Sequence, residues 1–213
     1  MKKVYIFGAG GHAANCIDVF LARAEFEPVI ISREPIDGQK WPCDDLTEDS
    51  APWADIKNVF VALGDNFQRN TLTVALKERL PAATFLQCIH PSVSIGFGTT
   101  IEDGVYIGAG SVVGPRCRIG ENSLVNCGVI IEHDSEFGQL VNIGTASGLG
   151  GGVRIGHRSV IGVGTKVIHG IRIGEDVLLA SGACVVKDVG DGQVMLGVPA
   201  VCRRTRKFGD RYL

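Results

Sequence analysis

Apolar residues, all but one of them aliphatic, recur at every sixth position from Ile89 to Gly190, without a single insertion or deletion. Written in sixes, this stretch gives 17 units, each beginning with Ile, Val, Leu or Phe and carrying a small or aliphatic residue at its fifth position. A unit of this kind cannot bury its apolar side alone and must stack on its neighbours, so the pattern predicts a parallel β-helix. An α-helix is excluded, because a period of six does not fit 3.6 residues per turn and the many glycines would destabilise it.

Residues 1–88 have a different pattern, in which short apolar runs alternate with segments of helical spacing. Four strands are expected, at 3–7, 28–32, 58–63 and 83–88. Two helices are expected, at 12–23 and 66–80, the second capped by Asn66 and stopped by Pro81. Strands that alternate with helices imply βαβ units and a parallel sheet. The polar stretch 37–57 is expected to be a loop with no more than one helical turn.

The chain is therefore predicted to have two domains, residues 1–88 and 89–213. Its net charge of −2 and its lack of a broad basic stretch argue against nucleic acid as a partner. Seven scattered cysteines without a CxxC pair fit a reducing cytoplasm and give no structural zinc signature. The apolar run after Lys2-Lys3 is too short for a signal peptide, and no stretch approaches the ~18 apolar residues of a membrane span. A cytoplasmic protein without a membrane segment is expected.

A glycine-rich turn follows the first predicted strand. Its sequence, Gly8-Ala9-Gly10-Gly11-His12-Ala13, matches the GxGxxA pattern of dinucleotide sites between a strand and a helix. Two features weigh against NAD. The second predicted strand does not end in the usual ribose-binding acid, for which Glu34 is the available substitute. In addition, 88 residues supply only half of a doubly wound sheet. A phosphate held by backbone N–H groups at the helix N-terminus is favoured. A tight turn without a ligand stays open as the alternative.

Three motifs in a fixed order resemble one family. They are GAGGH at 8–12, IEHDSEFG at 131–138 and the KDV…GVPA segment that begins at Lys187. Together they resemble the hexapeptide-repeat sugar O- and N-acetyltransferases related to sialic acid O-acetyltransferase and to the bacillosamine and perosamine N-acetyltransferases. The resemblance covers nearly the whole chain. It implies an α/β half-Rossmann domain that binds the nucleotide of a sugar nucleotide, then a left-handed parallel β-helix that trimerises and holds acetyl-CoA between neighbouring subunits.

The resemblance also implies roles for particular residues. His133 would be the general base and Asp134 its acidic companion. The nucleotide-linked sugar would be bound by the two loops that match the family's motifs, at Gly8, Gly10, Gly11 and His12 and at Gly64, Asp65 and Asn66. The sequence departs from several relatives at three places: Ser32-Arg33 replaces acidic residues, Asn142 replaces a histidine, and Gly190 replaces a frequent proline.

Stacking adds a geometric expectation. With three hexads per coil, as in the family, positions 18 apart lie above one another, so His133, Gly151, His169 and Lys187 form one column. At ~4.8 Å per coil, Lys187 lies about 14 Å from His133, which is roughly the reach of a pantetheine arm. The column, together with Asn142, predicts the acetyl-CoA site, with Gly151 N–H as oxyanion donor, His169 as wall and Lys187 as phosphate contact. For Lys187 a solvated position on the β-helix surface is the alternative.

The predicted function is acetyl-CoA-dependent N-acetylation of the amino group of a nucleotide-linked amino sugar, in a homotrimer. A thioester is already activated, so the enzyme needs a base that takes the proton of the attacking group, and histidine with an adjacent carboxylate suits this near neutral pH. O-acetylation of a sugar of the sialic acid type, a non-catalytic nucleotide-sugar-binding protein and an NAD-dependent oxidoreductase are the alternatives. No metal is expected, because the zinc site found in some left-handed β-helices needs two histidines five residues apart, and the chain has none.

Overall fold

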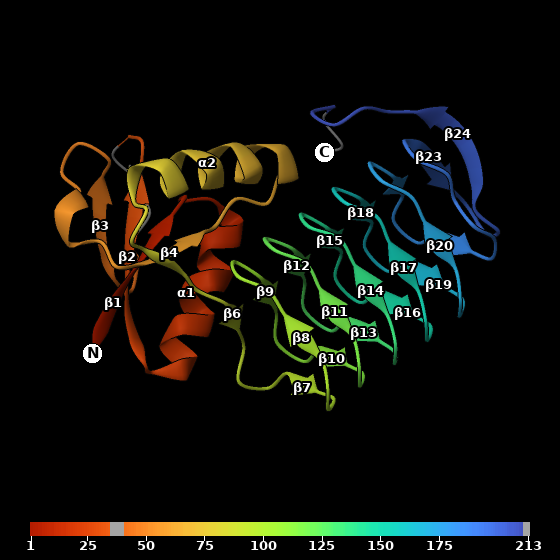
Figure 1. Cartoon of the computed structure of the whole chain (residues 1–213), viewed down its shortest axis with the longest axis horizontal. Helices are drawn as coiled ribbons and strands as arrows, with labels where there is room; N and C mark the ends of the chain where they lie inside the picture. Colours follow the sequence, from red (N-terminus) through yellow and green to blue (C-terminus); the bar gives the residue numbers. More distant parts are fainter. Residues whose placement is uncertain (35–40, 211–213) are drawn as a thin grey trace. The chain divides into compact units, whose positions relative to one another are not determined.

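The computed structural model describes residues 1–34 and 41–210 (Figure 1). The chain divides into two compact units, Met1–Pro91 and Ser92–Leu213. Residues 37–40 of the expected loop lie outside the described residues. Each unit is built on a parallel β architecture of its own.

The first unit contains a five-stranded parallel sheet in the order β3-β2-β1-β4-β5. Its elements are β1 (Lys2–Phe7), α1 (Gly11–Arg23), β2 (Phe26–Ser32), β3 (Asp44–Thr47), a 3-10 turn (Trp53–Asp55), β4 (Asn58–Val61), α2 (Asn66–Arg79) and β5 (Thr84–Phe85). Alternate side chains of a strand point to opposite faces. On one face Phe7 and Val61 pack with Leu76 of α2, and on the other Phe60 contacts Phe20 of α1 at 5.9 Å between ring centroids. The two helices therefore cover opposite faces, and the predicted half-Rossmann architecture is confirmed.

Three local predictions need correction. The polar stretch after residue 40 contains the strand β3, which pairs with β2, as well as the expected helical turn. Asn66 is the first residue of α2 and not its cap; the side chain of Asp65 accepts the backbone N–H of Gln68. The fourth expected strand is reduced to β5, followed by the separate short strand β6 (Cys88–Ile89).

The second unit is a left-handed parallel β-helix, as predicted. A two-residue strand occurs every six residues, and each pairs with the strand 18 residues away, as in Val112↔Ile130↔Gly148. The strands are β7 (Ser94–Ile95), β8 (Thr100–Ile101), β9 (Tyr106–Ile107), β10 (Val112–Val113), β11 (Arg118–Ile119), β12 (Leu124–Val125), β13 (Ile130–Ile131), β14 (Glu136–Phe137), β15 (Asn142–Ile143), β16 (Gly148–Leu149), β17 (Arg154–Ile155), β18 (Val160–Ile161), β19 (Lys166–Val167), β20 (Arg172–Ile173), β21 (Leu178–Leu179), β22 (Cys184–Val185), β23 (Gln193–Leu196) and β24 (Val201–Thr205).

The repeat positions have distinct structural roles. From Val105 onward the first and fifth residues of each unit are buried along the axis, and a buried hydroxyl such as Ser111 Oγ donates to a corner carbonyl, that of Asn126, at 2.9 Å. From Gly98 to Gly182 the fourth residue has a positive φ at every corner. Glycine adopts that conformation without strain, yet Arg116 and Asp134 adopt it too, both with φ 58°.

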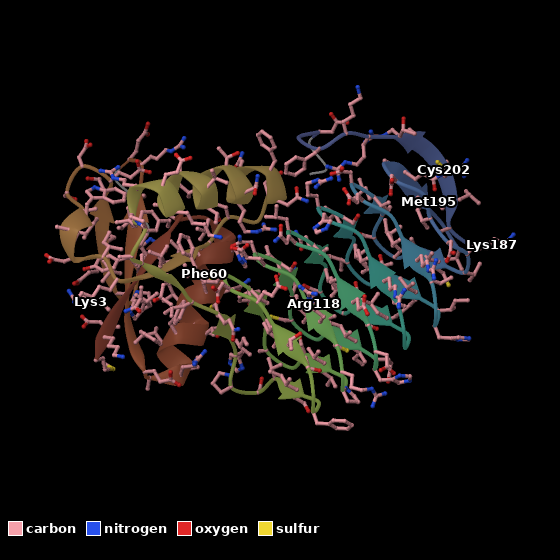
Figure 2. All side chains as sticks on the ribbon, in the orientation of Figure 1. Lys3, Phe60, Arg118, Lys187, Met195 and Cys202 are labelled. Carbon is pink, nitrogen blue, oxygen red and sulfur yellow. The ribbon has the colours of Figure 1, made fainter. Side chains whose placement is uncertain are left out.

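The 18-residue register ends after Val185. Val189 pairs with Ile173, and Leu178 pairs with Val194, so the last turn is two residues shorter than the repeat. The expectation of unbroken units up to Gly190 is therefore wrong for the final one. An antiparallel hairpin of β23 and β24 follows. Lys187 lies in this irregular turn, at the same end of the β-helix as Met195 and Cys202 (Figure 2).

Candidate active site

The corner between β13 and β14 places a histidine and a carboxylate side by side. His133 Nδ1 lies 2.6 Å from Asp134 Oδ2, and both side chains are about half exposed. Because a carboxylate only accepts hydrogen bonds, the proton of the ring lies on Nδ1 and the lone pair on Nε2. The positive φ of Asp134 turns the chain sharply here and brings the two neighbouring side chains to the same side. This pair can act as an oriented base.

Arg116 holds the carboxylate from the preceding coil. Its Nε donates to Asp134 Oδ1 at 2.6 Å and its Nη2 to Oδ2 at 2.8 Å, a bidentate arrangement. The hydrogen bonds from Arg116 first, and from His133 second, hold the pKa of the Asp134 carboxyl well below its usual range. The guanidinium also lies over the ring of Phe97, 5.7 Å from its centroid. Asp134 is therefore ionised whenever His133 is needed as a base.

Gly151 lies directly beside the imidazole ring, one coil further along. A Cβ at this position would come within 2.7 Å of both Cε1 and Nε2 of His133. The same corner continues with His169, since the N–H of Gly170 donates to the carbonyl of Gly151 at 2.9 Å. His133, Gly151 and His169 thus stand in consecutive coils, whereas Lys187 lies beyond the point where the 18-residue register ends.

Asn142 is not part of this corner within one chain. It lies in β15, in another sheet of the β-helix, where Asn126 Nδ2 donates to its Oδ1 at 3.1 Å. There it lines a second cavity of about 450 Å³ together with Thr145, Val163 and Ser181. The residues predicted to bind acetyl-CoA are thus distributed over two places on the β-helix.

The glycine turn of the first unit has the form of an anion site. Gly8 has φ 120°, and a Cβ there would lie 2.9 Å from the carbonyl oxygen of Ala62, so its own surroundings require glycine. A Cβ at Gly10 or Gly11 would meet nothing within 4 Å. Gly10 caps α1 without a side-chain hydrogen bond. Glycine at these two positions is therefore not explained by packing, and it leaves the backbone open to close approach by a ligand at a helix N-terminus.

The second predicted loop is held by a buried arginine. Arg69 of α2 is fully buried, and its Nη1 donates to the carbonyls of Leu63 at 2.7 Å and Gly64 at 2.9 Å. Burial, and secondarily the charge of Arg69, lower the pKa of His12 to about 4, so His12 is neutral at pH 7. The sequence places Arg69 on a helix but does not distinguish it from a solvated surface residue.

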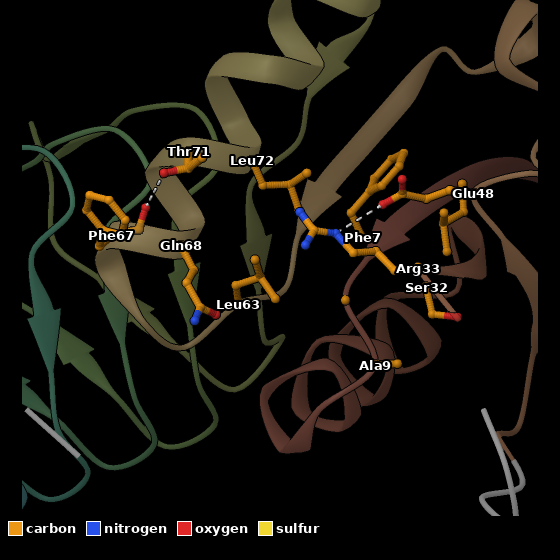
Figure 3. Close-up of a pocket in the computed structure, with 12 residues that line it drawn as sticks. Phe7, Ala9, Ser32, Arg33, Glu48, Leu63, Phe67, Gln68, Thr71 and Leu72 are labelled. Carbon is orange, nitrogen blue, oxygen red and sulfur yellow. Dashed lines mark hydrogen bonds and ion pairs between the residues drawn. The ribbon is translucent and has the colours of Figure 1, made fainter. Parts of the chain in front are cut away.

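A cavity of about 390 Å³ lies at the carboxyl ends of the strands of the first unit (Figure 3). Parallel α/β sheets bind their ligands at this edge. Of the residues predicted to bind the nucleotide sugar, Gly8 lines the cavity. No role was predicted from the sequence for the lining residues Arg33, Glu48 and Gln68. The full lining is Phe7, Gly8, Ala9, Ile31, Ser32, Arg33, Glu48, Leu63, Phe67, Gln68, Thr71 and Leu72.

Within residues 1–34 and 41–210, three or more His, Cys, Asp or Glu side chains nowhere gather as metal ligands would. Over the same residues, each helix is too short or too polar to cross a membrane.

Comparison with known proteins places the chain in a family. Residues 3–76 match the PglD N-terminal domain and residues 98–133 the bacterial transferase hexapeptide (six repeats). The chain is 30% identical to a histidine-to-asparagine variant of perosamine N-acetyltransferase from Caulobacter crescentus, in complex with CoA and GDP-perosamine, with a TM-score of 0.89 over 96% of this chain and 98% of that one. The chain belongs to the hexapeptide-repeat sugar acetyltransferases. A further member, the acetyltransferase domain of PglB from Neisseria gonorrhoeae in complex with acetyl coenzyme A, is 25% identical with a TM-score of 0.87, over 95% of this chain and 99% of that one.

Membership of the sugar acetyltransferases confirms two predictions at once. The fold is the half-Rossmann domain followed by a left-handed β-helix, and the enzyme class is acetyltransferase. The GAGGH turn therefore belongs to a sugar acetyltransferase and not to an NAD-dependent oxidoreductase.

Proposed function

We propose that this acetyltransferase transfers the acetyl group of acetyl-CoA to the amino group of a nucleotide-linked amino sugar, with His133 as general base. The observation that carries the proposal is the corner at which Arg116 fixes Asp134, Asp134 fixes Nδ1 of His133, and Gly151 leaves room beside the ring. The C. crescentus enzyme in complex with CoA and GDP-perosamine supports the choice of substrates.

The proposed chemistry requires one base and one oxyanion donor. The neutral amine attacks the thioester carbonyl while Nε2 of His133 accepts the proton that the nitrogen loses. The negative charge that develops on the carbonyl oxygen is met by a backbone N–H, which we assign to Gly151. When the tetrahedral intermediate collapses, the C–S bond breaks and the His133 imidazolium returns the proton to the CoA sulfur. Throughout, ionised Asp134 stabilises the imidazolium.

The substrates would be bound by separate parts of the chain. The nucleotide is assigned to the cavity of the first unit, with its phosphates at the turn of Gly8, Gly10, Gly11 and His12. Acetyl-CoA is assigned to the β-helix, with contacts from His169, Lys187 and Asn142. Because Asn142 and His133 lie in different sheets of one chain, we propose a homotrimer whose neighbouring subunits complete the site. The cysteines are free thiols in the structure, which fits a cytoplasmic location.

O-acetylation is the second candidate. An oriented base is needed most by a hydroxyl, which cannot lose its proton before attack at neutral pH. An amine with a pKa near 8 is already partly neutral at working pH. Residual activity of a His133 variant that rises with pH would favour the amine as acceptor.

Release of the CoA thiol tests the proposal. The purified chain is supplied with acetyl-CoA and a panel of UDP-, GDP- and dTDP-linked amino sugars, and His133→Ala is expected to lower kcat about 10²–10⁴-fold. His157→Ala, at another corner of the β-helix, is the matched control and keeps its kcat. Wild-type kcat for His133→Ala at pH 7 would remove His133 from the mechanism. Absence of thiol release with every amino sugar would contradict the proposed reaction.

A further inference from the structure

Two oppositely charged side chains lie next to each other in the cavity of the first unit (Figure 3). Arg33 follows β2 and Glu48 follows β3, directly after the last registered pair of the two strands, Ser32↔Thr47. Arg33 Nε lies 3.8 Å from Glu48 Oε1. Their position is set by the pairing of neighbouring parallel strands.

The backbone of Glu48 is held on both sides. Its N–H donates to the carbonyl of Ser32 at 2.8 Å, and its own carbonyl accepts Nε1–H of Trp53, also at 2.8 Å. The Arg33 side chain is 85% exposed and that of Glu48 37%. An ion pair of this length and exposure adds little to stability. The fold therefore fixes the backbone of Glu48 at the cavity wall, and both its carboxylate and the guanidinium beside it are available to a ligand.

The remaining walls suit a flat aromatic group. Phe7 and Ile31 come from the strands, and Leu63 and Leu72 from the loop after β4 and from α2. Gly8 and Ala9, from the phosphate-binding turn, line the same cavity. A nucleotide with its phosphates at that turn would thus place its base within reach of Arg33 and Glu48.

We propose that Arg33 and Glu48 select guanine as the base of the nucleotide substrate; this rests on the proposed function, in which this cavity holds the nucleotide. A carboxylate only accepts hydrogen bonds and a guanidinium only donates them. Guanine alone among the common bases presents two adjacent donors, N1–H and the N2 amino group, next to an acceptor, O6. Glu48 accepts the two donors in a bidentate manner and Arg33 donates to O6.

The other bases meet this pair with at least one mismatch. Uracil and thymine offer a single donor, N3–H, between two carbonyl oxygens, so one carboxylate oxygen would face a lone pair. Adenine and cytosine present an acceptor ring nitrogen where guanine has N1–H, and the carboxylate would repel it. A polar group that the bound base covers and leaves unpaired in this way lowers the affinity, and this is what makes hydrogen-bonding sites selective.

Calorimetric titration of the full chain with GDP, IDP, UDP, dTDP and ADP tests the assignment. GDP is expected to bind about 10- to 100-fold more tightly than UDP, which is the discrimination that one bidentate contact supplies. IDP, which lacks the N2 amino group but keeps N1–H and O6, is expected to bind between the two.

Two variants separate the roles of the pair. Glu48→Gln should remove the preference for GDP over IDP, because the amide no longer offers two acceptors. It should not weaken UDP, because the amide offers an acceptor to N3–H and a donor to the adjacent carbonyl oxygen, and retained UDP binding shows that the cavity is intact. Arg33→Ala should weaken GDP and IDP by the same factor, because both bases carry O6. Glu27→Gln is the matched control. This exposed glutamate lies near the start of β2, at the amino ends of the strands and away from the cavity, and its loss should change none of the affinities.

The outcomes distinguish this inference from the function on which it rests. If UDP or dTDP binds as tightly as GDP, or if Glu48→Gln keeps the preference for GDP over IDP, the guanine assignment is overturned and the nucleotide site stands. If none of the five diphosphates binds, the nucleotide site of the proposed function is overturned, and the assignment of the base with it.

Discussion

Gly151 limits where the imidazole ring of His133 can lie. A Cβ there would approach Cε1 and Nε2 to 2.7 Å, closer than such contacts occur, so Gly151→Ala must turn the ring away from its 2.6 Å contact with Asp134. We expect kcat to fall about 10²-fold, the effect of a displacement near 1 Å in a catalytic group, while nucleotide affinity is kept.

Gly148→Ala serves as the control for that substitution. Its Cβ would meet only the flexible side chain of Lys166, 3.2 Å away at the nearest atom. This variant should retain wild-type kcat. Equal losses in both variants, measured by CoA release, would mean that Gly151 acts through the general stability of the β-helix and not through His133.

His12 should make the first unit sensitive to acid. Its pKa is about 4 in the native state against an ordinary value of 6.5, so between these values the unfolded chain binds a proton that the native state does not. The free energy of unfolding is therefore undiminished above pH 6.5 and falls as the pH drops towards 4, by about 3 kcal/mol.

Urea unfolding followed by tryptophan fluorescence measures this, because both tryptophans, Trp41 and Trp53, lie within Met1–Pro91. His12→Gln should remove most of the slope between pH 6.5 and 4. The same slope in the variant and the wild type would show that other groups cause the acid sensitivity.

At single positions, the sequence predicted the neighbours of His133 and missed the partner of Asp134 and the pairing of Arg33 with Glu48. His133 with Asp134 follows from adjacency, and Gly151 beside His133 follows from the 18-residue spacing. Arg116 stands 18 residues before Asp134, so the same spacing applied to the fourth position of the unit would have found it. Arg33 and Glu48 could not be paired from sequence, because their proximity depends on β3. The polar residues of that segment gave no sign of a strand.

At the level of elements, the N-terminus of α2 offers a direct test of the corrected cap. Asp65→Ala removes the carboxylate that accepts the N–H of Gln68 at 2.9 Å, and should lower the free energy of unfolding of the first unit by about 1 kcal/mol. Asp18→Ala removes the same kind of side chain from the exposed face of α1, inside the helix, and should leave the free energy of unfolding unchanged. A loss for Asn66→Ala but none for Asp65→Ala would restore Asn66 as the cap.

Elements with a strong period were predicted almost to the residue. The hexads fixed the β-helix strands because each leading aliphatic residue must face the axis, and the apolar runs of β1, β2 and β4 are buried on both sides. β3 is an edge strand of sequence Asp-Asp-Leu-Thr, so neither alternation nor burial identifies it. The end of the β-helix was also missed: Val185 and Val189 keep the aliphatic pattern although the turn between them is two residues shorter.

For the whole molecule, the separation of His133 and Asn142 predicts a homotrimer with shared sites. Light scattering should give three chains per particle. His133→Ala and Asn142→Ala should each be weakly active alone, but mixing the two after dissociation should restore part of the activity, since some sites then combine a wild-type His133 with a wild-type Asn142 from the neighbour. An active monomer at working concentration, or no recovery on mixing, would contradict this arrangement.

The constant 18-residue register of the β-helix has a consequence for how the chain folds. Parallel sheets usually fold slowly, because their strands are brought together from distant parts of the sequence. Here each strand finds its partner 18 residues away, less than a tenth of the 213-residue chain, so the entropy lost in closing each loop is small. Each completed coil is the template for the next. The β-helix can therefore form progressively from its N-terminal end while the ribosome is still adding the last coils.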